Sequence, residues 1–393
     1  AGNPGRAGAA DESPRLEKRL KLHTMENKRL MSLDALRGFD MLFISGLSGL
    51  IMAICKLFPN GGESWLHDTM KHVKWDGLTH HDTIFPLFLF IAGVSFPFSY
   101  AKQQANGLSR KSTYFKILKR TLILILLGIV YNGFFKLDFE NMRICSVLGR
   151  IGMAWGIAAV LFINFKPAVR AIISGAILIG YWLVVCYIPA PDVPGGDPLT
   201  MQGTIVGWVD RMVTPGRLIY DGGRFDPEGL FSTLPAVVTA LLGMFTGEFL
   251  RIPDSRIDGT KKAGYMGLAA LGLLASGLVW SLVFPLNKML WSSSFVLVVG
   301  SYSLAMMALF YYIIDVKGWQ KWAFPLTVVG LNSITIYMLP RIVNIGGIVN
   351  FFLGGLMEYM PEAWAKVVSQ AGFLAVCWLA MYFLYKKKVF LKI

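Results

Sequence analysis

The sequence predicts an all-α polytopic integral membrane protein with about ten transmembrane helices and both termini in the cytoplasm. Hydrophobic residues make up 54 % of the 393-residue chain and charged residues only 16 %, against about 25 % charged residues in soluble domains. Apolar stretches of about 20 residues recur along the chain, which is the length of a membrane-spanning helix. Lys and Arg gather in alternate loops between these stretches, as is typical of cytoplasmic loops.

The apolar stretches can be placed in order along the chain. Residues 1–24 are rich in Gly, Ala, Lys and Arg without apolar periodicity, so we expect a non-native remnant or a disordered arm there. Residues 25–393 then form a single transmembrane domain. The expected spans lie near Gly38–Phe58, Thr83–Ala101, Ile117–Phe135, Ile144–Phe165, Ala168–Ile188, Leu230–Leu250, Ala263–Phe284, Leu290–Ile314, Trp322–Pro340 and Val367–Tyr385. Ile342–Met357 is apolar but glycine-rich, which favours an interfacial or re-entrant segment.

The charge pattern assigns the loops to two sides and excludes one class of partner. The exterior loops carry His72, Asp138 and the acidic stretch Pro191–Glu228, whereas the basic clusters are cytoplasmic. Because the net charge of +14 resides in these short clusters, it indicates membrane orientation rather than nucleic-acid binding. The four cysteines have no CxxC spacing, so neither a metal site nor a disulfide framework is predicted.

Polar residues in or beside the spans are candidates for function because they are costly in a bilayer. Each also has a structural interpretation. Asp34 and Arg37 are one helical turn apart and can pair at a helix start. Arg150 lies about two turns into a span, so we expect it to face an aqueous cavity or a carboxylate. The remaining sets are the helix-capping candidates Asp226 and Glu228, the turn residues Asn287 and Lys288, and Asn332, which can equally join helices.

The stretch from His72 to Pro86 gathers protonatable side chains at a predicted bilayer boundary, which indicates chemistry. It contains His72, Trp75, Asp76, His80, His81 and Asp82. His80 and His81, like His67, are expected to be solvated neighbours. A zinc site from His72, His80 and Asp82 is an alternative interpretation. A sugar or small-molecule transporter is another, since the spans and Arg150 would suit it equally well.

Taken in order, these sets resemble the heparan-α-glucosaminide N-acetyltransferase family of transmembrane acetyltransferases. The resemblance runs from Arg29 to about Tyr385 and rests on five elements. They are the SLDALRG opening, the His72–Pro86 stretch, Leu148–Gly152, Asp226–Gly229 and the Asn287-Lys288-x-x-Trp291 segment. The chain departs from animal lysosomal members in having Asp76 where Asn is usual and in its His80-His81 pair. We also expect no large lumenal N-terminal domain, and such a short form would suit a bacterial inner membrane.

The resemblance implies an acyltransferase domain that uses acetyl-CoA as acyl donor and a glucosamine-type saccharide as acceptor, with no metal and with a homodimer as one possible assembly. It places the catalytic histidine at His72, as general base or as carrier of the acetyl group, and its acidic partner at Asp82. A histidine suits this role because an amine attacks a thioester only when neutral, and a base that titrates near neutral pH serves the proton transfer. The other residues assigned to sites are Arg37, Arg120, Arg150 and Asn332 for the donor, and Trp75, Asp76, Asp226, Glu228, Asn287 and Lys288 for the acceptor. An O-acyltransferase with hydroxyl acceptors remains an alternative.

Overall fold

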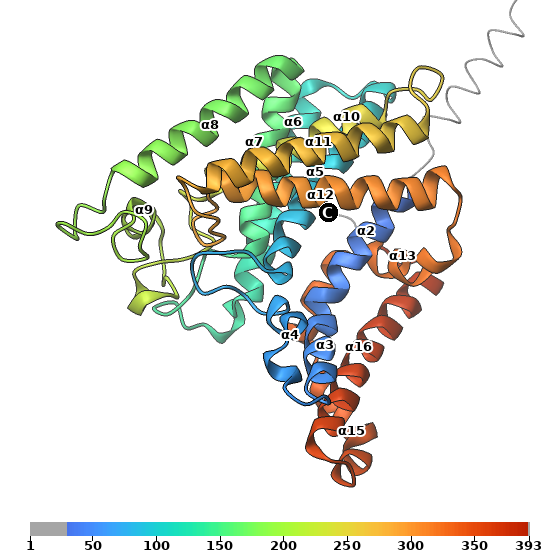
Figure 1. The fold of residues 1–393 in the computed structure, drawn as a ribbon. Coiled ribbons are helices and arrows are strands. Elements are labelled where there is room, and N and C mark those ends of the chain that lie inside the picture. The colour runs from blue at the N-terminus through green and yellow to red at the C-terminus, as the bar shows by residue number, and fades with distance from the viewer. Residues whose placement is uncertain (1–29, 392–393) are drawn as a thin grey trace, which may run out of the picture.

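The protein is described by a computed structural model covering residues 30–391, and helices connected by loops form all of its regular structure in that range (Figure 1). The expected arm at residues 1–24 lies outside the described residues. The helices are α2 Met31–Leu42, α3 Ser48–Cys55, α4 Trp65–Thr69, α5 His80–Ala105, α6 Arg110–Tyr131, α7 Val147–Asn164, α8 Pro167–Tyr187, α9 Ile205–Val213, α10 Thr233–Leu250, α11 Gly259–Ser281, α12 Ser293–Phe310, α13 Phe324–Gly330, α14 Ser333–Ile342, α15 Ile345–Glu358 and α16 Glu362–Lys386. The π-helical turns η1 Phe43–Leu47 and η5 Tyr311–Val316 continue α2 and α12.

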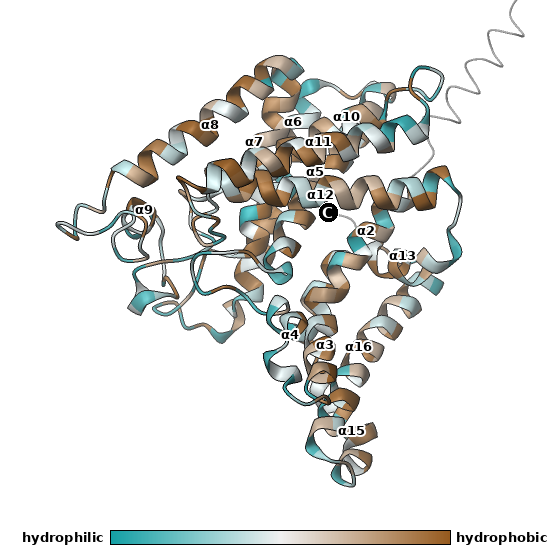
Figure 2. Ribbon diagram, in the orientation of Figure 1, coloured by the Kyte–Doolittle hydropathy of each residue, from teal (hydrophilic) through white to brown (hydrophobic). Residues whose placement is uncertain are grey.

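The centre of the larger helix group is the contact between α5 and α10. Glycines let their backbones meet: a Cβ at Gly93 would lie 2.2 Å from the Ala240 carbonyl oxygen, and one at Gly243 would lie 2.1 Å from that of Phe90. Small residues at such crossings give the close packing that associates helices in a bilayer. The outer helices α8 and α11 leave many large apolar side chains exposed, and Figure 2 shows hydrophobic residues along both. These helices therefore present a surface suited to lipid.

A second helix group combines α2 and α3 with α13 to α16 (Figure 1). Its key crossing is again built on glycine, since a Cβ at Gly38 would lie 1.8 Å from the Leu326 carbonyl oxygen. The predicted span Trp322–Pro340 is wrong as a single straight helix, because the chain bends by 59° between Lys321–Gly330 and Ser333–Ile342. Asn332 lies at this bend.

Within residues 30–391, eight helices are long and apolar enough to cross a membrane, or nine when the bent pair counts as one span. The all-α polytopic fold is thereby confirmed, while the predicted count of about ten is higher. The difference is α6, predicted as the span Ile117–Phe135. It runs from Arg110 to Tyr131 and carries five basic residues in its first half. The glycine-rich segment Ile342–Met357 forms all but the last residue of the 14-residue helix α15.

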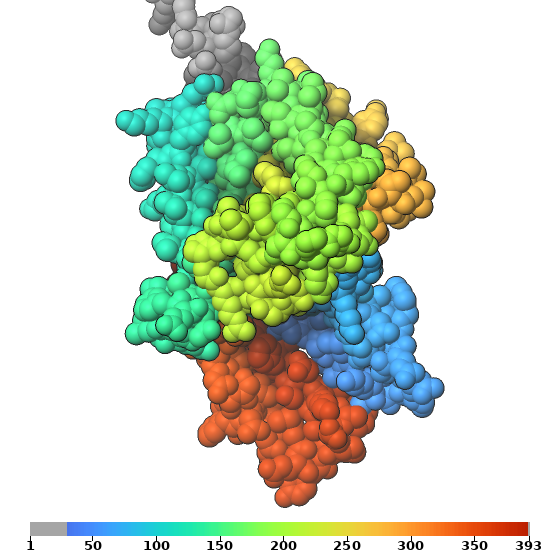
Figure 3. Space-filling model, turned by 90° about the vertical axis from the view of Figure 1, so that its left-hand side faces the viewer, coloured from blue at the N-terminus to red at the C-terminus, as the bar shows by residue number. Residues whose placement is uncertain are grey.

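The loops that the charge pattern assigned to one side do lie together on one face, which we call the loop face. It comprises residues 58–79, 132–146, 188–232 and 283–292. The Trp75 indole donates a 2.7 Å hydrogen bond to the Leu199 carbonyl, and the Gly77 amide donates one of 2.8 Å to that of Leu286. Figure 3 shows the yellow-green segment of the third range at the centre of this part of the surface. Which face meets the cytoplasm stays a prediction.

Candidate functional site

His72 and Asp82 are in direct contact on the loop face. The His72 Nδ1 and Asp82 Oδ1 atoms are 2.7 Å apart. A carboxylate accepts hydrogen bonds only, so this distance favours the tautomer in which Nδ1–H donates to Asp82 and Nε2 keeps its lone pair. The His72 side chain is 52 % exposed, whereas that of Asp82 is 1 % exposed. The pair therefore presents an accessible imidazole nitrogen held in orientation by a buried acid.

The local sequence explains why Asp82 occupies this position. Thr79 is the N-cap residue of α5 and Asp82 is its third residue, and the two form a capping box. Asp82 Oδ2 accepts hydrogen bonds from the Thr79 hydroxyl at 2.8 Å and from the Val73 amide at 3.3 Å. The Asp82 carboxylate thus caps the N-terminus of α5 through Oδ2 and orients His72 through Oδ1. The sequence prediction of an acid partner did not include this capping role.

Lys288, which is 216 residues further along the chain than His72, completes the cluster. Its Nζ lies 3.2 Å from Asp82 Oδ1 and 3.0 Å from His72 Nδ1. Since both nitrogens carry hydrogens, the simplest arrangement is two donors converging on one carboxylate oxygen. Burial lowers the pKa of Lys288, and the charges of Asp82 and Glu228 oppose this shift. Lys288 thus lies in contact with both the acid and the imidazole of the pair.

The loop that carries Lys288 is held tightly. Asn287 Oδ1 accepts from the Leu290 amide at 2.8 Å, and the Asn287 amide donates to Ser292 Oγ at 3.1 Å. Trp291 adopts a φ of +54°, which is unusual for a bulky residue, and is fully buried. Its indole donates to Thr239 Oγ1 at 3.2 Å. Backbone strain of this kind costs about 1–3 kcal/mol and persists only where the surroundings enforce it.

Opposite this cluster lies a second set of charges, centred on Arg143. Its guanidinium donates to both oxygens of Asp226, at 2.8 and 2.7 Å, and also to Glu228 Oε2. Burial alone would lower the pKa of Arg143, but the bonds and charges of the two acids outweigh it, and the pKa is raised. The sequence analysis treated these acids as caps or acceptor ligands. Arg143 was missed as their partner because 83 residues separate it from Asp226.

Arg150 lies beside this set, in the first turn of α7. It is 1 % exposed, and its Nη2 donates to the Gly229 carbonyl at 3.2 Å and to Ser232 Oγ. Its guanidinium carbon lies 5.1 Å from the centre of the Trp291 ring. The buried Asp210 packs behind the same turn, and burial raises its pKa to about 6. Arg150 lines a cavity, as predicted, but it lies in the first turn of α7 and not about two turns into a span.

The two sets face each other across a cavity of about 270 Å³. His72, Asp82 and Lys288 line it together with Arg143, Arg150 and Glu228. The other lining residues are Val73, Phe85, Tyr131, Asn132, Ser146, Val147, Ile219, Tyr220, Pro227, Met289, Trp291 and Tyr337. Tyr131 and Tyr337, which stack with ring centres 4.6 Å apart, were not predicted. No spacing pattern distinguishes them from other tyrosines in apolar helices.

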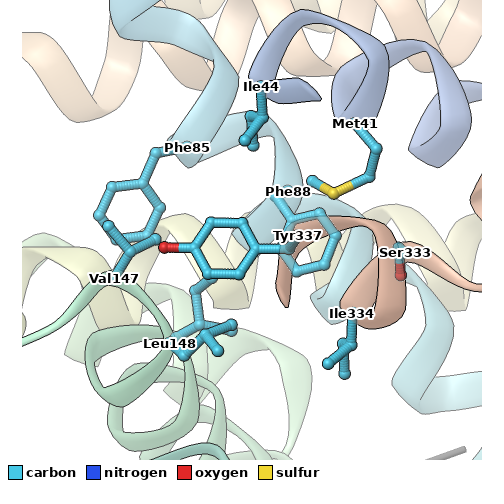
Figure 4. A pocket seen from close by; sticks show the side chains of 10 residues that line it. Met41, Ile44, Phe85, Phe88, Val147, Leu148, Ser333, Ile334 and Tyr337 are labelled. Carbon is cyan, nitrogen blue, oxygen red and sulfur yellow. The ribbon is translucent and has the colours of Figure 1, made fainter. Parts of the chain in front are cut away.

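A small apolar pocket adjoins the cavity deeper in the helices (Figure 4). Phe85, Val147 and Tyr337 line both spaces, and Figure 4 shows the Tyr337 hydroxyl pointing toward Phe85 and Val147. The rest of the pocket is lined by Met41, Ile44, Phe88, Leu148, Ile151, Ser333 and Ile334. The polar cavity therefore continues into an apolar space between α2, α5, α7 and α14.

Four predicted acceptor residues lie outside the cavity lining. Trp75 packs against Phe225 with ring centres 5.6 Å apart, in addition to its bond to Leu199. The Asp76 carboxylate accepts a 3.2 Å hydrogen bond from the Asn287 amide group, so these two residues join the loops that carry His72 and Lys288. Asp226 is fully buried behind Arg143. Their positions support the loops around the cavity.

The residues predicted to bind the acyl donor lie in three separate parts of the structure. Arg150 lies at the cavity. Arg37 on α2 donates to Ser95 Oγ at 2.9 Å, and Arg120 on α6 packs on the Trp155 ring at 4.1 Å and lies within electrostatic range of Arg37. Asn332 binds the backbone of the C-terminal segment, donating to the Val389 carbonyl and accepting from the Leu391 amide, both at 3.0 Å. Arg37 also lies 3.5 Å from Asp34 Oδ1, the pair that the sequence predicted. Arg37 and Arg120 thus form a separate basic site outside the cavity lining.

The neighbouring histidines are less exposed than predicted. His67 is buried, so its assignment as a solvated residue is wrong. His80 and His81 are partly buried: His80 Nε2 lies 3.2 Å from the Tyr302 hydroxyl, and His81 Nδ1 lies 3.0 Å from Ser48 Oγ. The His81 ring also contacts that of His72, with centres 4.4 Å apart. In the described part of the chain no three His, Cys, Asp or Glu side chains converge as metal ligands.

Comparison with known proteins gives two relatives of one name. The chain is 28 % identical to human heparan-α-glucosaminide N-acetyltransferase, over 93 % of the chain and 60 % of that protein. It is 26 % identical to the mouse protein of the same name, over the whole chain and 64 % of the relative. The chain therefore spans less than two thirds of the length of these relatives. No family model matches the sequence.

The similarity extends over nearly the whole chain and agrees with the ordered motifs, several of which meet at the cavity. On this evidence the chain is similar over nearly its whole length to the heparan-α-glucosaminide N-acetyltransferases of human and mouse.

Proposed function

We propose that this protein is an acetyltransferase that moves the acetyl group of acetyl-CoA to the amine of a glucosamine-type saccharide on the far side of a membrane. The observation that carries the proposal is the contact of 2.7 Å between His72 and Asp82 at the wall of the cavity. An imidazole oriented by a carboxylate, with its other nitrogen free, is the arrangement of a general base. The names of the two relatives support the choice of reaction.

The transfer can be written with these groups. The neutral amine attacks the thioester carbonyl carbon, and His72 Nε2 takes the proton that the amine loses. The bond between carbon and sulfur then breaks, and the departing CoA thiolate takes that proton from His72. The products are an amide and free CoA. Asp82 keeps the imidazole oriented and stabilises its transient positive charge.

The donor is expected to enter from the basic site at Arg37 and Arg120. Helix α5 carries Asp82 at the cavity, then Phe85 and Phe88 at the apolar pocket, then Ser95 in contact with Arg37. Asp82 and Ser95 are separated by about 20 Å along the helix axis. Arginine is suited to the CoA phosphates, and the apolar pocket between the two levels suits the less polar arm that ends in the thioester.

Sugar-dependent release of CoA tests the proposal. Purified protein is reconstituted into vesicles, acetyl-CoA is supplied on one side, and glucosamine or glucose on the other. We expect release of CoA with glucosamine and the formation of N-acetylglucosamine. A transporter would carry the sugar without acetyl-CoA, and an O-acyltransferase would accept glucose. Either result would replace the proposal.

A further inference from the structure

Arg150 has hydrogen-bond donors that no described residue of the protein accepts from. Its Nη2 supplies both of its hydrogens to Gly229 and Ser232. The Nε and Nη1 atoms are buried and have no partner in the described chain, which leaves three N–H donors. An unpaired buried donor costs about 1–3 kcal/mol, so three on one charged group need an explanation.

The surrounding charges do not neutralise Arg150. Among the described residues no carboxylate forms an ion pair with it, and the nearby Asp226 and Glu228 are both bonded to Arg143. The Trp291 ring supports the guanidinium at 5.1 Å but cannot accept its in-plane hydrogens. The cation is therefore held in place by Nη2 while the rest of its hydrogen-bonding edge is free.

The free edge belongs to a side chain that lines the same cavity as His72 and Lys288. The Arg143 and Lys288 side chains, which also line the cavity, are already paired with carboxylates. Arg143 is paired with Asp226 and Glu228, and Lys288 with Asp82. A ligand oxygen in the cavity is thus the natural partner for Arg150. Because the guanidinium is 1 % exposed, water competes weakly, and its attraction for a negative oxygen is stronger than it would be at the surface.

We propose that Arg150 binds the carbonyl oxygen of the thioester and stabilises the negative charge that develops on it during transfer. This inference rests on the proposed acetyltransferase function. As the bond from nitrogen to carbon forms, the carbonyl π electrons move onto oxygen, where Nε and Nη1 of Arg150 donate to them. When the carbonyl re-forms, the bond to sulfur breaks, and the thiolate takes the proton held by His72. Arg150 gives up no proton, since arginine stays charged.

The oxygen atom itself provides the test. In dithioacetyl-CoA a sulfur replaces the carbonyl oxygen, and sulfur is a much weaker hydrogen-bond acceptor. Turnover with acetyl-CoA and with dithioacetyl-CoA is measured for the parent protein, Arg150→Lys and Arg150→Gln. Arg170→Lys is the matched control, because Arg170 is equally buried and its Nε and Nη1 also lack a partner in the described chain. Unlike Arg150, it bonds a carboxylate, Glu248, at 2.8 Å and lies outside the cavity lining. Stabilisation by CoA against heating reports folding and donor binding for each variant.

We expect Arg150→Gln to lose about 10²–10³-fold in kcat with acetyl-CoA, as for loss of an oxyanion donor, and far less with dithioacetyl-CoA. Arg150→Lys should fall between, and Arg170→Lys should keep the parental ratio between the donors. Equal losses with both donors, or no loss, would overturn the inference and leave Arg150 as a support for the Gly229–Ser232 turn. A parent protein inactive with acetyl-CoA would instead refute the proposed function.

Discussion

The two walls of the cavity are built in different ways. The first, His72 with Asp82, comes from residues ten apart in the sequence, and its acid is fixed by the capping box that begins α5. The second, Arg143 and Arg150 with the acids near residue 227, joins segments about 80 residues apart. The comparison indicates that the first wall transfers the proton of the amine, while the arginines of the second wall bind negatively charged groups. Substitutions should therefore separate loss of rate from loss of stability.

His72→Ala should give the largest effect. Loss of a positioned general base costs about 10²–10⁴-fold in rate, whereas thermal stability should change little because the side chain is half exposed. Turnover and thermal unfolding are measured on the same preparation. Lys74→Ala is the control, since Lys74 is exposed and two residues away. Near-parental turnover of His72→Ala would remove the catalytic assignment.

Arg143→Met should reverse this balance. It leaves the buried Asp226 and the largely buried Glu228 without their cation, which costs about 3–5 kcal/mol of stability when one partner of a buried pair is removed. The control Arg211→Met breaks the more exposed pair with Asp192 and should cost about 1 kcal/mol or less. Thermal or denaturant unfolding in detergent compares the two. Equal losses would mean that the second wall is not a buried charge cluster.

Asp82→Asn should affect both properties. The amide can still accept at one oxygen but no longer stabilises a positive His72, so turnover should fall by no more than in His72→Ala. The weakened capping box should lower stability by about 1 kcal/mol. Thr79→Val is the informative companion, because it removes the hydroxyl that bonds Asp82 Oδ2 without touching His72. A variant of Asp82 with parental kinetics would contradict the orienting role.

Asp210→Asn should have the smallest effect, visible as a change in pH dependence. Burial raises the pKa of Asp210 to about 6 from its ordinary value of 3.8, so the folded protein binds this proton more tightly than the unfolded chain. The stability from this group is complete below pH 3.8 and is lost as the pH rises through about 6. Between pH 5 and 7 the loss is about 1 kcal/mol. The variant should lack this slope in pH-dependent unfolding, and an unchanged slope would reject the assignment.

The sequence predicted the local parts of this molecule well. Apolar length and loop charge identified an all-α membrane protein, and the resemblance placed a catalytic histidine and its acidic partner at His72 and Asp82. Lys288 and Glu228, which were assigned to the acceptor, both line the cavity, and their role there stays a prediction. Helix periodicity and capping are short-range properties, which is why a single sequence contains them.

The sequence did not reveal the contacts between residues that are far apart in the chain. Nothing in the spacing connects Arg143 with Asp226, and Trp75, Asp76 and Asn287 have the chemistry of ligands although they join loops. Asn332 was assigned to the donor, yet both ends of its amide group bind the C-terminal backbone. The bend at that residue was also unpredicted, because an apolar segment of span length gives no indication of a break.

Affinity labelling tests the central claim, that the free nitrogen of His72 faces the bound amino sugar, most directly. N-bromoacetylglucosamine carries an alkylating carbon where the acetyl group would sit, and mass spectrometry locates its attachment. We predict alkylation of His72 at Nε2, slowed by glucosamine and accompanied by loss of turnover, with Lys74 unmodified. Inactivation with the label on another residue, while His72 stays unmodified, would contradict the account.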